Sequence, residues 1–108
     1  MKYLITESQK EKIALKWMND NFSPNQLEVV TSEKYPDSIF YRKNGKVVME
    51  QNKKNKLFYF DYHDIWSFFM SFFGMEHTEI QQLMKVWLVE AFKLRSYTPE
   101  TGVWTAVG

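Results

Sequence analysis

The chain has 108 residues, of which 44% are hydrophobic and 18% aromatic, so it has the size and composition of one folded domain rather than of a disordered protein. Its net charge of +1 excludes the strongly basic character of a dedicated nucleic-acid-binding protein, so any electrostatic function must come from local patches. The absence of cysteine excludes disulfides, thiolate metal sites and cysteine nucleophiles.

The N-terminal residues predict a helix. Thr6 and Gln9 have the spacing of a capping box, in which the two side chains satisfy free amide groups at a helix start. The apolar residues that follow are spaced for one helix face, and the helix is expected to end near Phe22 (Ile13, Ala14, Trp17, Met18). No apolar secretory signal precedes this helix, so we expect a cytoplasmic protein.

Four short segments then show the alternation and composition typical of strands: 27–31, 38–43, 46–51 and 56–60. Their close succession predicts a three- or four-stranded antiparallel meander, although the sequence leaves the pairing of the first segment open. Asn44-Gly45 predicts a two-residue hairpin turn between the second and third segments.

This turn sets Lys43 opposite Lys46 and predicts a register for the strands beyond it. The register pairs Arg42 with Val47, Tyr41 with Val48, Phe40 with Met49 and, across the next turn, Met49 with Phe58 and Val48 with Tyr59. Since paired residues share a sheet face, one face is expected to be the core side (Phe40, Val47, Met49, Phe58, Phe60). The other face is expected to be amphipathic and open to solvent (Ile39, Tyr41, Val48, Leu57, Tyr59).

The segment 64–75 predicts a second helix, capped by Asp61 or Asp64 and ended by Gly74. It is too short and too often interrupted by serine to span a bilayer, and it lacks the basic face of a membrane-surface helix. Because the segment is apolar almost all round, it is either a central core helix or partly an interface with another chain. The residues predicted for such a partner interface are Trp66, Phe69, Phe72 and Phe73.

A third helix is predicted to open at Thr78, with Gln81 completing a second capping-box spacing. Its core stripe is regularly spaced (Ile80, Leu83, Met84, Trp87, Leu88, Ala91, Phe92). The following segment 96–102 is expected to be a turn-rich linker, so we predict one domain over 1–95 and a tail over 96–108. Whether Trp104 of this tail docks on the domain is left open.

The sequence offers little for catalysis or metal binding. Its four glycines are dispersed and form no phosphate-binding loop. The only histidines are His63 and His77, and a single metal ion held by them with nearby carboxylates is an alternative that the sequence leaves open. We therefore expect no catalytic residue, no metal and no cofactor, and a protein that is not an enzyme.

The charge pattern suggests a second kind of function. The segment 34–56 contains seven basic and two acidic residues, whereas the segment 61–90 is acidic. Basic loops around exposed tyrosines are typical of single-stranded nucleic-acid binding, which uses stacking and phosphate contacts. The residues predicted for this alternative are Tyr41, Tyr59, Lys43, Lys46, Lys53 and Lys54.

Residues 5–9 read Ile-Thr-Glu-Ser-Gln, and in this opening the chain resembles small accessory proteins of marine tailed phages. The resemblance implies a protein that acts in the cytoplasm of an infected bacterium, and it implies no functional residues. The expected fold is α+β, with an N-terminal helix, the antiparallel meander and two C-terminal helices packed on one sheet face. The expected function is a non-enzymatic protein-interaction module that pairs with a second copy of itself, as a homodimer, or with a host protein.

Overall fold

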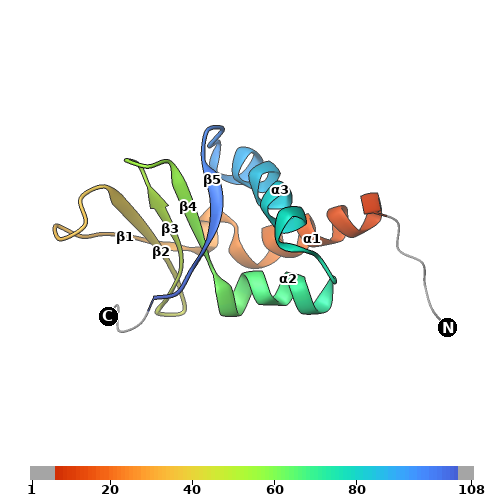
Figure 1. Ribbon diagram of the computed structural model, residues 1–108. Coiled ribbons are helices and arrows are strands. Elements are labelled where there is room, and N and C mark those ends of the chain that lie inside the picture. The colour runs from red at the N-terminus through yellow and green to blue at the C-terminus, as the bar shows by residue number, and fades with distance from the viewer. Residues whose placement is uncertain (1–6, 105–108) are drawn as a thin grey trace.

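The computed structural model describes residues 7–104, and over these residues the predicted α+β class is confirmed. Figure 1 shows the strands side by side on the left and the three α-helices on the right. The elements in chain order are α1 (Glu7–Phe22), η1 (Pro24–Gln26), β1 (Glu28–Thr31), β2 (Ser38–Lys43), β3 (Lys46–Asn52), β4 (Leu57–Asp61), η2 (Tyr62–Trp66), α2 (Ser67–Phe72), α3 (His77–Trp87), η3 (Leu88–Phe92) and β5 (Thr98–Gly102). None of the helices within this range is long and apolar enough to cross a membrane.

The sheet has five strands in the order β1-β2-β3-β4-β5, with β1 to β4 antiparallel and β5 parallel to β4. The predicted meander of three or four strands therefore has too few strands, because the segment expected to be a linker contributes β5. Three of its five residues are of types depleted in strands (Pro99, Glu100, Gly102), so the sequence does not predict this strand. The strand forms because η3 carries the chain back to the sheet, where Tyr97 and Pro99 are buried and the Thr98 amide donates to the Lys56 carbonyl at 2.9 Å.

The register of the β2–β3 hairpin follows the prediction only next to the turn. Lys43 pairs with Lys46 and Arg42 with Val47, but Tyr41 then pairs with Met49 instead of Val48. A β-bulge at this point inserts one extra residue into β3, so the pairing shifts by one beyond it. The next turn moves the β3–β4 register as well, and Met49 pairs with Phe60 rather than with Phe58.

This shift changes the face on which β2 places its side chains. Tyr41, predicted to face solvent, lies against Phe92 of η3 with ring centroids 5.1 Å apart. Val48 is likewise part of the core, whereas Phe40 and Val47 lie on the face away from the helices. We call this second face the outer face. Met49, Phe58 and Phe60 are buried in the core as predicted.

The predicted second helix is confirmed, and η2 and α2 form it without a break. The Asp61 carboxylate accepts a hydrogen bond from the Asp64 amide at 2.8 Å and so caps the first turn. At the other end Gly74 takes a positive φ of 63°, which glycine adopts without a steric penalty. Trp66 and Phe69 of this helix are fully buried against the rest of the domain.

The first and third helices are also confirmed, with a correction at one cap. The helix α3 begins at His77, and its capping box joins Glu76 to Glu79 rather than starting from Thr78. Carboxylates at both positions satisfy the free amides, and the cap Glu76 lies two residues before the predicted Thr78 cap. Thr6, the predicted cap of α1, lies outside the described residues, as does the end of the predicted tail, 105–108.

Candidate functional site

Three aromatic rings form a ladder on the outside of the helices. The indole of Trp17 in α1 stacks on the ring of Phe68 in α2, with centroids 4.3 Å apart and planes inclined by 18°. Phe68 in turn stacks on Phe72, with centroids 5.0 Å apart and planes inclined by 9°. Each helix supplies its part through residues that lie on one face, because Phe68 and Phe72 are one helical turn apart.

The ladder emerges at the surface at Phe72, whose residue is 69% exposed. Ile13, one turn before Trp17 in α1, is 47% exposed. Phe73 borders the ladder, since its ring meets that of Phe72 edge to face at 5.0 Å. The contacting rings, together with Ile13 one turn away, form an apolar surface on α1 and α2 that we call the aromatic patch (Ile13, Trp17, Phe68, Phe72, Phe73).

The structure divides the four residues predicted for a partner interface into two pairs. Phe72 and Phe73 belong to the aromatic patch. Trp66 and Phe69 have no exposed area and are core residues, so their prediction as interface residues is wrong for this structure. A helix buried on one side only leaves the residues of its other side free, and the sequence pattern does not say which side that is.

Sequence reasoning missed Trp17 and Phe68 as surface residues. The helical spacing groups Trp17 with the buried Ala14 and Met18 on one face of α1, but Trp17 is only partly buried, and the ring of Phe68 in α2 covers one of its faces. The available signal was the spacing of four residues that places Ile13 beside Trp17 and Phe68 beside Phe72. Neither pair shows from sequence that the two helices lie next to each other.

A second candidate site is a cavity of about 410 Å³ on the outer face of the sheet. Strands β1 to β3 form its floor, the β1–β2 loop forms one wall and the segment after β5 another. We call it the outer-face pocket, and it is lined by Val30, Ser32, Tyr35, Phe40, Arg42, Val47, Glu50, Val103 and Trp104. A cavity of this volume with mostly apolar walls and a few polar groups is typical of small-ligand sites.

Trp104 forms its wall through specific contacts, and the question of whether it docks on the domain is thereby answered. Its indole N–H donates to the Glu50 carboxylate at 3.0 Å. The indole also lies so close to Gly102 that a Cβ on this glycine would be 2.8 Å from the ring. Val103 and Trp104 therefore line the outer face, and the Trp104 ring packs closely over Gly102, where a side chain would displace it.

The residues predicted for nucleic-acid binding are not brought together. Tyr41 is buried, where its hydroxyl donates to Gln51 at 3.0 Å, so its prediction as an exposed stacking platform is wrong. Burial, followed by the nearby Tyr97, raises the pKa of Tyr41 above 10.0. Tyr59 is half-buried on the outer face, where its Cβ lies against Gly102.

The four lysines of this hypothesis also separate. Lys43 donates to the Asn21 carbonyl, and its ammonium lies 4.6 Å from the centre of the Phe22 ring. Lys46 is occupied by two carboxylates, as described below. Lys53 and Lys54 are exposed in the next turn, at the opposite end of the hairpin. Only two of the four are thus exposed and outside these internal contacts.

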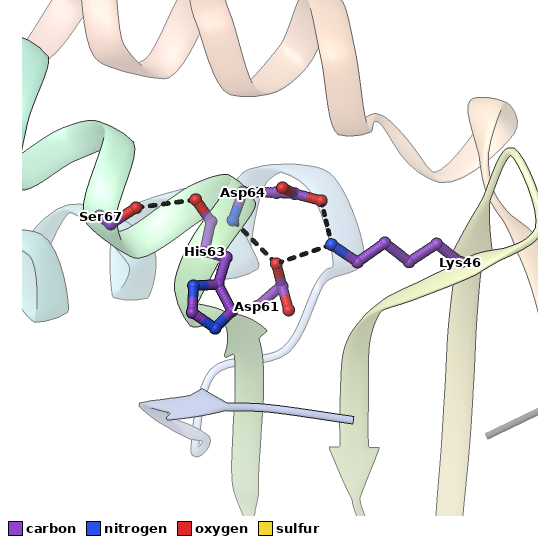
Figure 2. A network of polar contacts seen from close by, with 5 residues as sticks. All are labelled: Lys46, Asp61, His63, Asp64 and Ser67. Atoms are coloured by element: carbon purple, nitrogen blue, oxygen red, sulfur yellow. Dashed lines mark hydrogen bonds and ion pairs between the residues drawn. The ribbon is translucent and has the colours of Figure 1, made fainter. Parts of the chain in front are cut away.

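Lys46 links the β2–β3 turn to the beginning of η2 (Figure 2). Its ammonium lies 2.6 Å from an Asp64 carboxylate oxygen and 3.5 Å from the Asp61 carboxylate, which is itself buried. The hydrogen bond with Asp64, and secondarily the charge of Asp61, raises the pKa of Lys46. The network joins two parts of the chain and caps the helix that begins at Tyr62.

The histidines do not assemble a metal site. Figure 2 shows that His63 contributes its backbone carbonyl, which accepts from the Ser67 hydroxyl at 2.7 Å. His77 is exposed at the start of α3. In the part of the chain that the structure describes, no three His, Asp or Glu side chains come together as metal ligands would.

No family model, no curated protein and no solved structure matches the chain.

Proposed function

We propose that this protein is a non-enzymatic interaction module that self-associates as a twofold dimer through the aromatic patch. The observation that carries the proposal is the 69% exposure of Phe72 at the end of a stack of parallel rings. Solvent-exposed apolar surfaces that are continuous over several residues mark interaction sites more often than scattered single residues do.

A second copy fits the patch because the ladder is open at one end. The ring planes of Trp17, Phe68 and Phe72 are nearly parallel, so one face of Phe72 is set to continue the stack. In a twofold arrangement the two Phe72 rings meet across the axis, and each patch covers the other. Burying each ring contributes about 1.5 to 3 kcal/mol relative to leaving it exposed.

The surrounding charges are compatible with a pair of identical chains. Lys16 and Asp20, which flank Trp17 in α1, form an exposed ion pair at 2.6 Å, so the rim of the patch carries both signs. The net charge of +1 per chain gives little repulsion between two copies. A polar rim around an apolar centre is the usual organisation of a protein interface.

Size-exclusion chromatography with light scattering on Phe72→Glu tests the proposal. The variant is expected to be monomeric at concentrations where the wild type is dimeric, because a charge would have to be buried at the centre of the interface. Met70→Glu is the matched control, since Met70 is 42% exposed on the same helix but does not belong to the aromatic patch. It is expected to remain dimeric.

Circular dichroism of both variants checks that the fold is retained, as expected for exposed positions. Dimers of equal strength for wild type and Phe72→Glu would refute the proposed interface. Loss of the dimer in Met70→Glu but not in Phe72→Glu would place the interface on another side of α2.

A further inference from the structure

The outer-face pocket lies on the side of the sheet away from the helices, and the self-association proposal leaves it unused. Its walls and floor are mostly apolar, with Val30, Phe40 and Val47 on the strands and Tyr35 and Val103 on the flanking segments. Tyr35 stands edge-on to Phe40, with ring centroids 6.1 Å apart. Such a site accommodates a small flat or branched apolar group.

Each carboxylate oxygen of Glu50 in the pocket already accepts one hydrogen bond from within the protein. One Glu50 carboxylate oxygen accepts from the Ser38 hydroxyl at 2.7 Å, and the other accepts from the Trp104 indole at 3.0 Å. Glu50 thus holds the wall of the pocket in place and does not require a donor from a ligand. A cationic ligand would have to share the Glu50 oxygens with Ser38 and Trp104.

The donor groups of the pocket, in contrast, exceed their partners. Arg42 carries five N–H donors, and its Nε is buried without a hydrogen-bond partner among the described residues. Its Nη2 lies 3.3 Å from a Glu28 carboxylate oxygen, a long contact to a side chain that is 62% exposed. A buried donor without an acceptor is unfavourable, and because Nε has almost no exposed area, a ligand oxygen reaches it only if the Arg42 side chain shifts toward the pocket. The hydrogen bond gained by this shift satisfies a donor that is otherwise buried without a partner.

From these observations we infer that the outer-face pocket binds a small monocarboxylate with an aromatic or branched aliphatic body. The body packs on Phe40 and Val47, and the carboxylate accepts from the guanidinium of Arg42, whose planar donor geometry matches two carboxylate oxygens. Glu28 is the competing carboxylate at this guanidinium and yields to the ligand because it is largely exposed.

The test uses three probes of one shape, namely 3-phenylpropionate, 3-phenylpropanamide and 3-phenylpropylammonium. Binding is followed by two-dimensional NMR on the full chain, through the indole N–H of Trp104 and the Nε–H of Arg42. We expect the carboxylate to bind about tenfold more tightly than the amide, because the hydrogen bond is then charge-assisted, and the ammonium to bind most weakly.

Two variants and a control locate the effect. Arg42→Met keeps the apolar stem and is expected to abolish the preference for carboxylate over amide, whereas Glu28→Gln removes the competitor and is expected to tighten carboxylate binding. Lys85→Met, which removes an exposed cation of α3 far from the pocket, is expected to leave both affinities unchanged.

Several outcomes would overturn the inference. Equal affinity for all three probes, stronger binding of the ammonium, or no change at Trp104 and Arg42 at millimolar concentrations of every probe would each do so. A preserved carboxylate preference in a folded Arg42→Met protein would also contradict it, since the guanidinium would then not be the recognition group.

Discussion

The indole of Trp17 stacks on the ring of Phe68 with centroids 4.3 Å apart, and this contact joins the first helix to the second. The residues are far apart in the sequence, yet their stack sets the position of Phe72. The same aromatic contact therefore stabilises the helical layer and presents the exposed end of the ladder.

Shortening Trp17 is expected to lower the stability of the protein more than shortening Phe72 does. In Trp17→Ala the free energy of unfolding should fall by about 2 kcal/mol, because a partly buried ring and its stacking contact with Phe68 are lost. Phe72→Ala should change it by less than about 0.5 kcal/mol in the monomer, since that ring is exposed. Urea unfolding at low protein concentration measures both, and equal losses would contradict the assigned exposure.

Gly102→Ala is expected to displace Trp104 from the outer face. The added methyl group would approach the indole to 2.8 Å, so the ring must move and its hydrogen bond to Glu50 is lost. The NMR signal of the Trp104 indole N–H should shift toward its value in a solvent-exposed tryptophan. An unchanged signal would show that the segment after β5 does not pack as described.

The two aspartates that surround Lys46 should differ in their effect on stability. Asp61→Ala removes a buried helix cap and should lower the free energy of unfolding by about 1 to 2 kcal/mol. Asp64→Ala breaks a half-exposed ion pair and should cost less than about 1 kcal/mol. Thermal or urea unfolding compares them, and a larger loss in Asp64→Ala would reverse the assigned roles.

Stability is expected to decrease at alkaline pH through Tyr41. Burial raises the folded-state pKa of Tyr41 above 10.0, so the folded state holds this proton more tightly than the unfolded state does. The contribution of the protonated Tyr41 hydroxyl to the free energy of unfolding is complete below pH 10, and it is lost as the pH rises through the folded-state pKa. Tyr41→Phe should show a shallower decrease of unfolding free energy above pH 10.

Urea unfolding of the wild type and Tyr41→Phe at pH 7 measures the effect of losing the hydrogen bond to Gln51 separately from the effect of pH. That bond should lower the stability of Tyr41→Phe by about 1 kcal/mol at neutral pH. Identical slopes for both proteins above pH 10 would contradict the assigned burial of the hydroxyl.

Local signals in the sequence predict the three helices and the first four strands, but not β5 and not how the elements lie relative to one another. The Asn44-Gly45 turn fixed the first two pairs of the hairpin, and the helical spacing predicted the three helices. A single bulged residue, Val48, then reversed the faces of β2, because one extra residue moves every later side chain to the other side of the sheet. Such a bulge has no distinct sequence signature.

The candidate sites depend on contacts between distant segments, and sequence reasoning found only their parts. The sequence predicts Phe72 and Phe73 as interface residues, but Trp17 belongs to the same surface only because α1 and α2 pack side by side. The outer-face pocket needs β5 to place Trp104 over the sheet, and a segment rich in proline and glycine does not predict a strand. Both sites therefore depend on contacts between segments that are far apart in the sequence.

Sedimentation equilibrium of the wild-type protein over a range of concentrations tests the central claim most directly. One chain has a mass of 13.0 kDa, and the proposed twofold dimer predicts that the measured mass rises with concentration to twice that value. It also predicts little dependence on salt, because the aromatic patch is apolar. A mass that stays at that of a single chain up to millimolar concentration would contradict self-association through the aromatic patch.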